Sequence, residues 1–173
     1  MDFLCISCDL TFKDGEKNDF AVMQVWGRSG ANKYLLDQVR SRMGFNGQLV
    51  ALKGLVAKWD GLNAVYIEDA ANGAAMVDTV RKTIPGIIPV RAVGSKIARA
   101  EAVAPQIEAG NIYLPDPSLA AWVHDYIEEW STFPNATHDD QVDATSQAIS
   151  KLTTHRKYNW KPQSITGPSK WLK

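Results

Sequence analysis

The chain contains 173 residues, of which 19 are basic and 19 are acidic, so its formal net charge is zero. This length fits one domain, with or without a short tail, and a hydrophobic content of 45% is typical of globular proteins. No apolar run approaches the roughly 20 residues that span a bilayer, and we see no signal peptide, so we expect neither a membrane-spanning nor a secreted protein. The balanced charge also argues at first against nucleic acid as a partner, because proteins that bind it usually carry a basic excess.

The first part of the chain reads as a meander of three strands. A predicted strand over residues 3–10 leads into a polar stretch with the turn signal Asp14-Gly15, and alternating residues predict a second strand over 20–26. Another turn follows at residues 28–32, and a third strand begins at Tyr34.

After this meander the hydrophobic pattern changes to alternating helices and strands. Leu49, Leu52 and Leu55 recur at helical spacing in the first of the predicted helices. The predicted elements are a helix over 45–59, a strand over 64–67, a helix over 73–84, a strand over 87–90, a helix over 96–109, a strand over 112–114, and helices over 118–131 and 139–153. This order predicts an α/β fold, a mixed β-sheet flanked by helices.

Four of the six tryptophans lie in the C-terminal third of the chain, two in a predicted helix and two in the tail. The apolar face of the helix over 118–131 is expected to pack in the core, and it carries Trp122, Val123, Ile127 and Trp130. The last residues are rich in proline and basic side chains and read as a tail that docks through Trp160 or Trp171, or is mobile. We therefore expect one domain over residues 1–153 and a tail over 154–173.

Cys5 and Cys8 form a C-x-x-C motif, but they lie inside the first predicted strand. A spacing of three residues places them on opposite faces of a strand, so they cannot easily form a disulfide or share a metal ion. Redox pairs of the thioredoxin type sit at a helix start, and a structural zinc site needs a second cysteine pair. We expect two buried, reduced packing residues.

Acidic residues lie where three of the predicted elements end or begin. They are Asp9 after the first strand, Glu68 and Asp69 after the strand over 64–67, and Asp139, Asp140 and Asp143 at the start of the last helix. Strand-end side chains of an α/β sheet converge at its carboxyl edge, where ligands bind. Carboxylates from three elements make a hard-oxygen site for Mg²⁺ or Mn²⁺, and two such ions roughly 4 Å apart suit hydrolysis of a phosphodiester.

Each acid taken alone also fits a structural role. Asp9 could form a strand-end turn, and Asp139 or Asp140 could cap the last helix, whose macrodipole favours acids at its start. The ordered set of three acidic clusters, rather than any single residue, favours a divalent-metal site.

Four segments in chain order resemble the motifs of the C-terminal nuclease domain of phage large terminase subunits. They are Ser7-Cys8-Asp9 with residues 10–12, Tyr66-Ile67-Glu68-Asp69 with residues 70–73, residues 94–100 with their continuation over 104–115, and Phe133-Pro134 followed by His138-Asp139-Asp140 and residues 141–144. The resemblance covers residues 3 to 152, and the four motifs together are specific, whereas any one alone is weak.

The resemblance implies an RNase H-like fold and a metal-dependent endonuclease that cuts concatemeric double-stranded viral DNA during genome packaging in a bacterial cytoplasm. It implies a two-metal site for Mg²⁺ or Mn²⁺. The implied partners are DNA, the terminase ATPase domain, the small terminase subunit and the portal. The catalytic acids of the family carry over to Asp9, to the Glu68-Asp69 pair and to Asp140.

Adjacent residues on a strand point to opposite faces, so only one of Glu68 and Asp69 is expected to ligate strongly. We take Asp69 as the metal ligand together with Asp9 and Asp140, because the last residue of a strand can bend towards the metals, and we keep Glu68 as the alternative. Three further residues are candidates for orienting the ligands or the attacking water, namely His138, Asp139 and Asp143. His138 also fits an ordinary loop position before a helix.

Lys96 and Arg99 lie three residues apart at the start of a predicted helix, so they share a face. There they could contact a DNA phosphate with help from the helix N-terminus, and a solvated helix face is the alternative. Weaker candidates for a DNA-facing patch are Arg28, Lys33, Arg40, Arg42 and Arg91.

No G-x-x-x-x-G-K-[ST] motif occurs in the chain, so we do not expect it to contain the ATPase motor of a complete large terminase. We expect an excised domain or a free-standing nuclease that cannot translocate DNA by itself. Two alternatives stay open: another RNase H-like nuclease, such as a Holliday-junction resolvase, and a non-catalytic DNA-packaging or portal-docking module. Bound cations would neutralise the clustered acids, so a net charge of zero is compatible with a DNA partner.

Overall fold

The structure is a computed structural model that describes residues 1–11, 20–69 and 71–154. The turn expected at Asp14-Gly15 and the tail with Trp160 and Trp171 lie outside the described residues. Within the described ranges, no helix is long and apolar enough to cross a membrane.

The described residues form six strands and five helices, in the alternating order that the hydrophobic pattern predicts. The strands are β1 (Phe3–Asp9), β2 (Ala21–Ser29), β3 (Asn32–Ser41), β4 (Ala64–Glu68), β5 (Ile87–Val90) and β6 (Ile112–Tyr113). The helices are α1 (Phe45–Lys58), α2 (Ala71–Val80), α3 (Lys96–Glu108), α4 (Val123–Thr132) and α5 (Asp140–Thr154).

The strands form one mixed sheet in the order β5-β4-β1-β2-β3-β6. Strand β2 runs antiparallel to β1 and β3, whereas β1 with β4, β4 with β5, and β3 with β6 are parallel pairs. The carboxyl ends of all these strands except β2 therefore lie at one edge of the sheet. This arrangement confirms the predicted mixed sheet flanked by helices.

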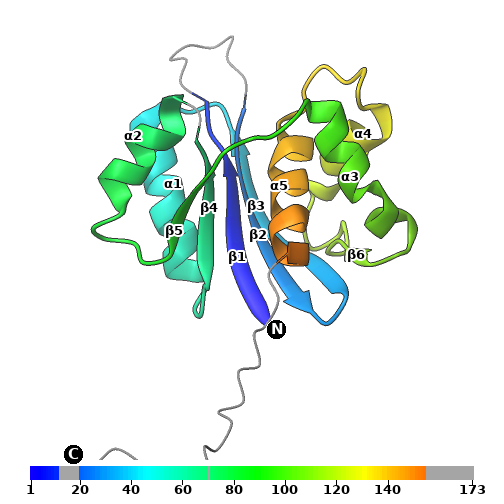
Figure 1. The fold of residues 1–173 in the computed structure, drawn as a ribbon, viewed down its shortest axis with the longest axis horizontal. Helices are drawn as coiled ribbons and strands as arrows, with labels where there is room; N and C mark the ends of the chain where they lie inside the picture. Colours follow the sequence, from blue (N-terminus) through cyan, green and yellow to red (C-terminus); the bar gives the residue numbers. More distant parts are fainter. Residues whose placement is uncertain (12–19, 70, 155–173) are drawn as a thin grey trace, which may run out of the picture.

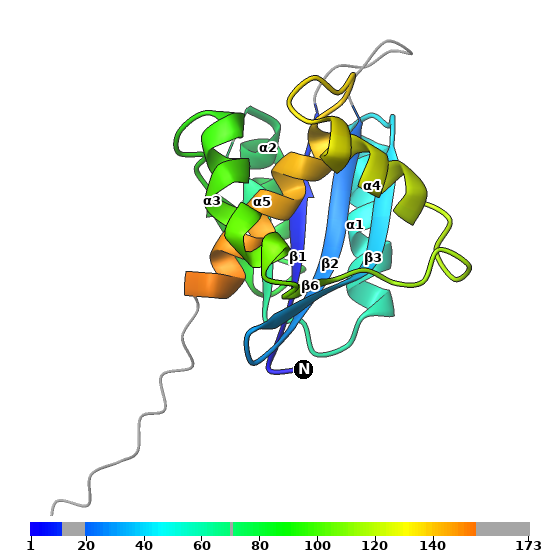
Figure 2. The same ribbon diagram turned by 90° about the vertical axis from the view of Figure 1, so that its right-hand side faces the viewer.

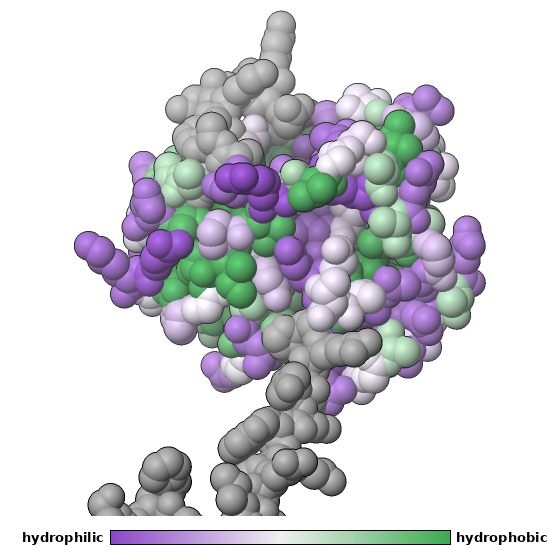
Figure 3. All heavy atoms as spheres, in the orientation of Figure 1, coloured by the Kyte–Doolittle hydropathy of each residue, from purple (hydrophilic) through white to green (hydrophobic). Residues whose placement is uncertain are grey.

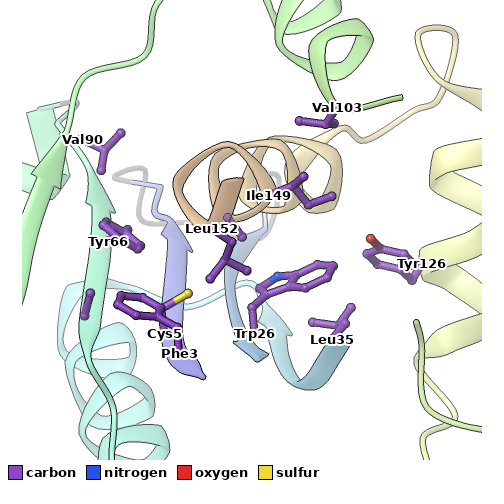
Figure 4. Close-up of a cluster of buried hydrophobic side chains, with 12 residues drawn as sticks. Phe3, Cys5, Trp26, Leu35, Tyr66, Val90, Val103, Tyr126, Ile149 and Leu152 are labelled. Atoms are coloured by element: carbon purple, nitrogen blue, oxygen red, sulfur yellow. The ribbon is translucent and has the colours of Figure 1, made fainter. Parts of the chain in front are cut away.

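Helices cover the two faces of the sheet in separate layers (Figure 1). Helices α1 and α2 lie on one face, and α3, α4 and α5 lie on the other, where α5 crosses the sheet diagonally in the view of Figure 2. The sheet accordingly divides the apolar core into two clusters. The cluster beneath α5 includes Trp26, Tyr126 and Leu152, which Figure 4 shows pointing into the space between sheet and helices.

The two cysteines belong to different clusters, as their spacing on a strand predicts. Cys5 packs in the cluster beneath α5, and Cys8 packs in the cluster beneath α1 and α2. Both thiols are buried and free, and burial raises the pKa of Cys5 to about 12. The structure thus confirms that both are buried packing residues on opposite faces of β1.

Strand β3 contains an extra residue, Leu36, relative to its partner β2. The resulting bulge lets both Leu35 and Gln38 face α5, whereas Asp37 faces α1. The Asp37 carboxylate accepts a hydrogen bond of 2.7 Å from Lys58 Nζ at the end of α1. One strand thereby holds both helical layers through neighbouring residues.

Helix α4 differs from its prediction at its start and on its buried face. It begins at Val123 rather than at residue 118, and the preceding segment is held in turns by the Asp116 carboxylate, which accepts hydrogen bonds from the Ser118 N–H (2.8 Å) and hydroxyl (2.6 Å). Ile127, which we expected in the core, is 49% exposed. Glu129 is buried in its place, because its carboxylate turns inward to the start of α5.

Candidate functional site

Asp9 and Glu68 lie side by side at the carboxyl ends of β1 and β4. These strands are parallel neighbours, and Cys8 lies opposite Ile67. The residues that follow them, Asp9 and Glu68, are therefore also adjacent. Cys8 and Ile67 both pack beneath α1 and α2. Alternation along a strand therefore turns Asp9 and Glu68 to the opposite face, towards α5.

Asp69 follows Glu68 and is exposed. Its backbone N–H donates to the Val90 carbonyl at 2.7 Å, which extends the pairing of β4 with β5 beyond the end of β4. Because the backbone stays in register there, Asp69 continues the alternation and does not bend towards Asp9. The structure thus brings the alternative, Glu68, to Asp9, and not the residue that we chose from the sequence.

The start of α5 brings two more carboxylates to this edge of the sheet. Asp140 and Asp143 are 7% and 5% exposed and lie one helical turn apart. The Ser7 hydroxyl of β1 donates to the Ala144 carbonyl at 2.7 Å, and this contact holds Asp143 near the end of β1. The carboxylates of Asp9, Glu68, Asp140 and Asp143 are called the carboxylate cluster below.

The members of the carboxylate cluster act on one another electrostatically. Burial is the main cause that raises the pKa of Asp9 well above its usual value. Further contributions in the same direction come, in decreasing order, from Asp143, Glu68 and Asp140. Burial also raises the pKa of Glu68. Like charges in a poorly solvated place disfavour ionisation, and a bound cation would remove this penalty.

Two cations of α3 are bound to the acids of the α5 start. Lys96 Nζ lies 2.6 Å from Asp139 Oδ1 and 2.9 Å from Asp143 Oδ2. Arg99 Nη2 lies 2.6 Å from Asp143 Oδ1, and the two side chains of this pair are 19% and 4% exposed. Burial acts to lower the pKa of Lys96, but its hydrogen bonds to Asp139 and Asp143 outweigh this effect and raise the pKa. The two residues predicted to contact DNA therefore hold acids of the site.

His138 makes its contact on the other side of the α5 start. Its ring meets the ring of Phe20 edge-on, with the centroids 4.9 Å apart. The guanidinium groups of Arg40 and Arg42 lie 3.9 and 4.4 Å from the centroid of the same Phe20 ring. His138 thus packs with Phe20, beside Arg40 and Arg42, and the contacts described for it do not involve the carboxylate cluster.

Sequence reasoning missed Glu129, which holds the first turn of α5. Its Oε1 accepts hydrogen bonds from the backbone N–H groups of Gln141 (2.7 Å) and Val142 (3.2 Å), and its Oε2 lies 3.3 Å from Arg40. An acceptor at a helix N-terminus satisfies free N–H groups and interacts favourably with the macrodipole. The sequence carries only the pair Glu128-Glu129 on an amphipathic helix, and this pattern does not indicate which acid turns inward.

A buried polar network continues from α5 into the sheet. Gln38 Nε2 donates to Gln141 Oε1, and Gln24 Nε2 donates to Gln38 Oε1, both at 2.8 Å. The Thr145 hydroxyl and the Trp26 indole N–H both donate to Gln24 Oε1 at 3.0 Å. Buried polar groups stabilise one arrangement when they are paired with one another. The network therefore sets how α5, and with it Asp140 and Asp143, lies over β2 and β3.

The donor atoms of the carboxylate cluster are of the type that a hard divalent cation prefers. All of them are carboxylate oxygens, which Mg²⁺ and Mn²⁺ favour. Burial raises the pKa of Asp9, and the neighbouring carboxylates add to this effect. Among the described residues, no three His, Cys, Asp or Glu side chains surround a common point for an ion. The ion pairs of Asp143 with Lys96 and Arg99 direct its carboxylate to α3 in this arrangement.

A groove of about 360 Å³ opens beside the carboxylate cluster. Glu68, Arg99 and Asp143 line one end, and Lys151 and Thr154 of α5 line the groove farther along. Figure 3 is drawn from the side where the segment between β5 and α3 crosses the molecule, and it shows a hollow with hydrophilic residues near the centre.

Comparisons with known proteins agree with this architecture. The family model of the terminase RNaseH-like domain matches residues 6–152. No curated protein sequence matches the chain.

Solved structures of terminases share the fold. A large terminase from a thermophilic bacteriophage has a TM-score of 0.68 and 13% identity, over 87% of this chain and 40% of that one. The large terminase nuclease from thermophilic phage G20c has a TM-score of 0.62 and 18% identity, over 86% and 82%. The human cytomegalovirus terminase nuclease domain, soaked with manganese and bound to an inhibitor, has a TM-score of 0.61 and 10% identity, over 87% and 82%.

The chain spans about 40% of the length of the first of these structures, the bacteriophage large terminase, but most of the two nuclease structures. The family match extends from the middle of β1 to the last turn of α5, so it includes the three elements that carry the carboxylate cluster. The chain therefore belongs to the family of terminase RNaseH-like domains.

Proposed function

We propose that this chain is a divalent-metal-dependent endonuclease that cleaves concatemeric double-stranded viral DNA during genome packaging. The observation that carries the proposal is the carboxylate cluster, which β1, β4 and α5 build at the carboxyl edge of the sheet. The membership in the terminase family supports the reaction, and the manganese soaked into the cytomegalovirus nuclease domain supports the choice of metal.

Asp9, Glu68 and Asp140 are the residues that would hold Mg²⁺ or Mn²⁺, with Asp69 as the alternative to Glu68. When bound, two such ions supply Lewis-acid stabilisation of the phosphodiester and a nucleophile from water at neutral pH. Asp9 and Glu68 come from rigid neighbouring strands, and Asp140 comes from a helix whose first turn is fixed by Glu129. These elements fix the backbone positions from which the ligand side chains would reach the ions.

Lys96, Arg99, Asp139 and Asp143 would support this centre. Arg99 holds the buried Asp143, and Lys96 joins Asp143 to the more exposed Asp139. With 48% of its side chain exposed, Lys96 also remains accessible to a phosphate of the DNA. We propose that His138 orients the segment before α5 through its contact with Phe20, rather than transferring a proton.

The partners follow from the family. We propose that the chain acts together with a terminase ATPase domain, which would move the DNA, and with the small terminase subunit and the portal. The bacteriophage large terminase with a TM-score of 0.68 is more than twice as long as the part that this chain matches, which supports such an additional domain.

Plasmid cleavage in Mg²⁺ and in Mn²⁺ tests the proposed function. We expect the wild type to cut, and Asp9→Ala and Asp140→Ala to lose more than about 100-fold in rate while remaining folded. Asp60→Ala, at an exposed turn, is the matched control and should cut normally. If Asp140→Ala cuts normally, the helical acid is misassigned, and Asp139 or Asp143 becomes the candidate.

The same assay separates the alternatives. A wild type that neither cuts nor binds Mn²⁺ at millimolar concentration would be a non-catalytic packaging or docking module. A preference for branched over linear DNA would instead support a resolvase.

A further inference from the structure

Helix α5 presents a polar face to the groove beside the carboxylate cluster. The residues of α5 on this face are Asp143, Ser146, Gln147, Ser150, Lys151, Thr153 and Thr154. Between Asp143 and Thr154 the helix rises about 17 Å. The other wall is formed by the end of β5 with Arg91, and by α3 with Arg99 and Gln106. The groove therefore leads from the carboxylate cluster along α5 towards its C-terminal end.

The charges that line the groove are not evenly distributed. The acids of the lining are Glu68 and Asp143, and both belong to the carboxylate cluster. Arg99, at the same end, is bound to Asp143 at 2.6 Å. Arg91 and Lys151 line the groove beyond the cluster, and neither forms an ion pair with another residue of the described part of the chain. Away from the cluster, the charge of the groove is thus positive, and no ion pair with another described residue neutralises it.

We infer that the groove binds the sugar–phosphate backbone of one strand of the DNA substrate, with Arg91 and Lys151 contacting phosphates on one side of the cleaved bond. This inference rests on the proposed function, because the bound strand must pass the carboxylate cluster. One strand of B-DNA rises about 3.4 Å per nucleotide, so the length of the groove accommodates several nucleotides. Hydroxyl groups such as that of Ser150 are further donors to phosphate oxygens.

The contrast between the two groups of cations supports this assignment. A cation already paired with a carboxylate must lose that partner before it can bind a phosphate, whereas Arg91 and Lys151 have none to lose among the residues that the structure describes. Their contacts with DNA would release counterions from the phosphates, and this gain depends steeply on salt concentration. Arg91 and Lys151 are therefore the phosphate contacts along the groove, in addition to the contact proposed for Lys96 beside the carboxylate cluster.

Fluorescence anisotropy of the full chain with a labelled 30-base-pair duplex, in EDTA to prevent cleavage, tests the inference. We expect Arg91→Gln and Lys151→Gln each to weaken binding by roughly threefold to tenfold at low salt. Each should also reduce the slope of log Kd against log salt by about 1, and the double variant by about 2. Lys53→Gln, exposed on α1 at the other face of the sheet, is the matched control and should bind as the wild type does.

Plasmid cleavage by the same variants distinguishes binding from an indirect effect. We expect the KM for DNA to rise while kcat is unchanged, and we expect Lys151→Arg to restore the wild-type KM, because the charge is kept. Wild-type affinity and salt slope in the double variant would overturn the inference, as would a lower kcat with an unchanged KM. If Lys151→Gln does not fold, Arg91→Gln alone carries the test, because Arg91 is exposed. A wild type that binds the duplex but does not cut plasmid would contradict the proposed function. The salt dependence of duplex binding by the variants would then still test whether the groove binds DNA.

Discussion

Glu129 and Asp9 are two carboxylates near the start of α5, and their surroundings differ. Glu129 is 6% exposed and accepts hydrogen bonds from the Gln141 and Val142 N–H groups, with Arg40 3.3 Å away. For Asp9, burial raises the pKa most, and the negative charges of other carboxylates raise it further. One acid is satisfied by the protein itself, whereas the other has an excess of negative charge around it.

This difference separates a structural acid from a functional acid better than burial alone. A buried charge that is surrounded by donors stabilises the fold around it. A buried charge that is surrounded by like charges destabilises the fold unless a ligand binds, and such places are candidate sites for cations. The comparison therefore predicts opposite responses when each carboxylate is removed.

Removing the Glu129 carboxylate should have the largest effect. In Glu129→Ala the two N–H groups at the start of α5 and the Arg40 guanidinium lose their acceptor, and we expect a loss of about 3 kcal/mol in the free energy of unfolding. Urea denaturation in EDTA measures this loss. The control is Glu128→Ala, which removes an exposed neighbour and should change stability by less than about 0.5 kcal/mol. Equal stability of the two variants would show that Glu129 does not cap α5.

The pair Glu68-Asp69 offers the next test, because only Glu68 faces Asp9. We expect Glu68→Gln to weaken Mn²⁺ binding by about tenfold or more, and the isosteric Asp69→Asn to leave it within about twofold. Isothermal titration of Mn²⁺ into each variant measures both values. The opposite order would identify Asp69 as the ligand, as we first expected from the sequence, and would mean that the backbone bends after β4.

Neutralising Asp9 should increase the stability of the metal-free protein. Asp9→Asn removes one charge from the carboxylate cluster, and we expect a gain on the order of 1 kcal/mol in EDTA. The same variant should lose the stabilisation that Mn²⁺ gives the wild type. Thermal unfolding with and without Mn²⁺ measures both effects, with Asp60→Asn as the control. A clear loss of stability in EDTA would place Asp9 with Glu129 among the structural acids.

The gain in stability from Asp9→Asn should also depend on pH. Because the pKa of Asp9 is raised above 3.8, the native state holds this proton more tightly than the unfolded chain does. The stability that Asp9 contributes is therefore full below pH 3.8 and is lost as the pH rises through its raised pKa. The advantage of Asp9→Asn in EDTA should grow over this interval, by at most about 1.4 kcal/mol per pH unit. A difference between the two proteins that does not change with pH would contradict the raised pKa.

Local patterns were sufficient to predict the elements and the edge at which the acids meet. The change from alternating to helical spacing marks the end of the meander, and Pro85-Gly86 separates α2 from β5. The convergence of strand ends at one edge of an α/β sheet predicts the position of Asp9. Such features depend on residues close together in the sequence.

The side-chain orientations and partners that the sequence does not predict depend on residues far apart in the chain. Alternation predicts that Glu68 and Asp69 face opposite ways, but which of them meets Asp9 depends on the face of β4 that packs beneath α5. The position of Lys96 at a helix start does not reveal that its side chain also binds Asp139, which lies 43 residues later in the chain. Likewise, the sequence of α4 does not show that Glu129 accepts hydrogen bonds from the start of α5.

The bulge at Leu36 has a consequence for how chains of this kind can vary in length. Leu35 and Gln38 hold the α5 layer, and Asp37 between them holds the end of α1. One residue added or removed within this short run would turn the following side chains to the wrong faces and release both layers at once. In related sequences we therefore expect insertions and deletions at the ends of β3, and a constant number of residues around the bulge.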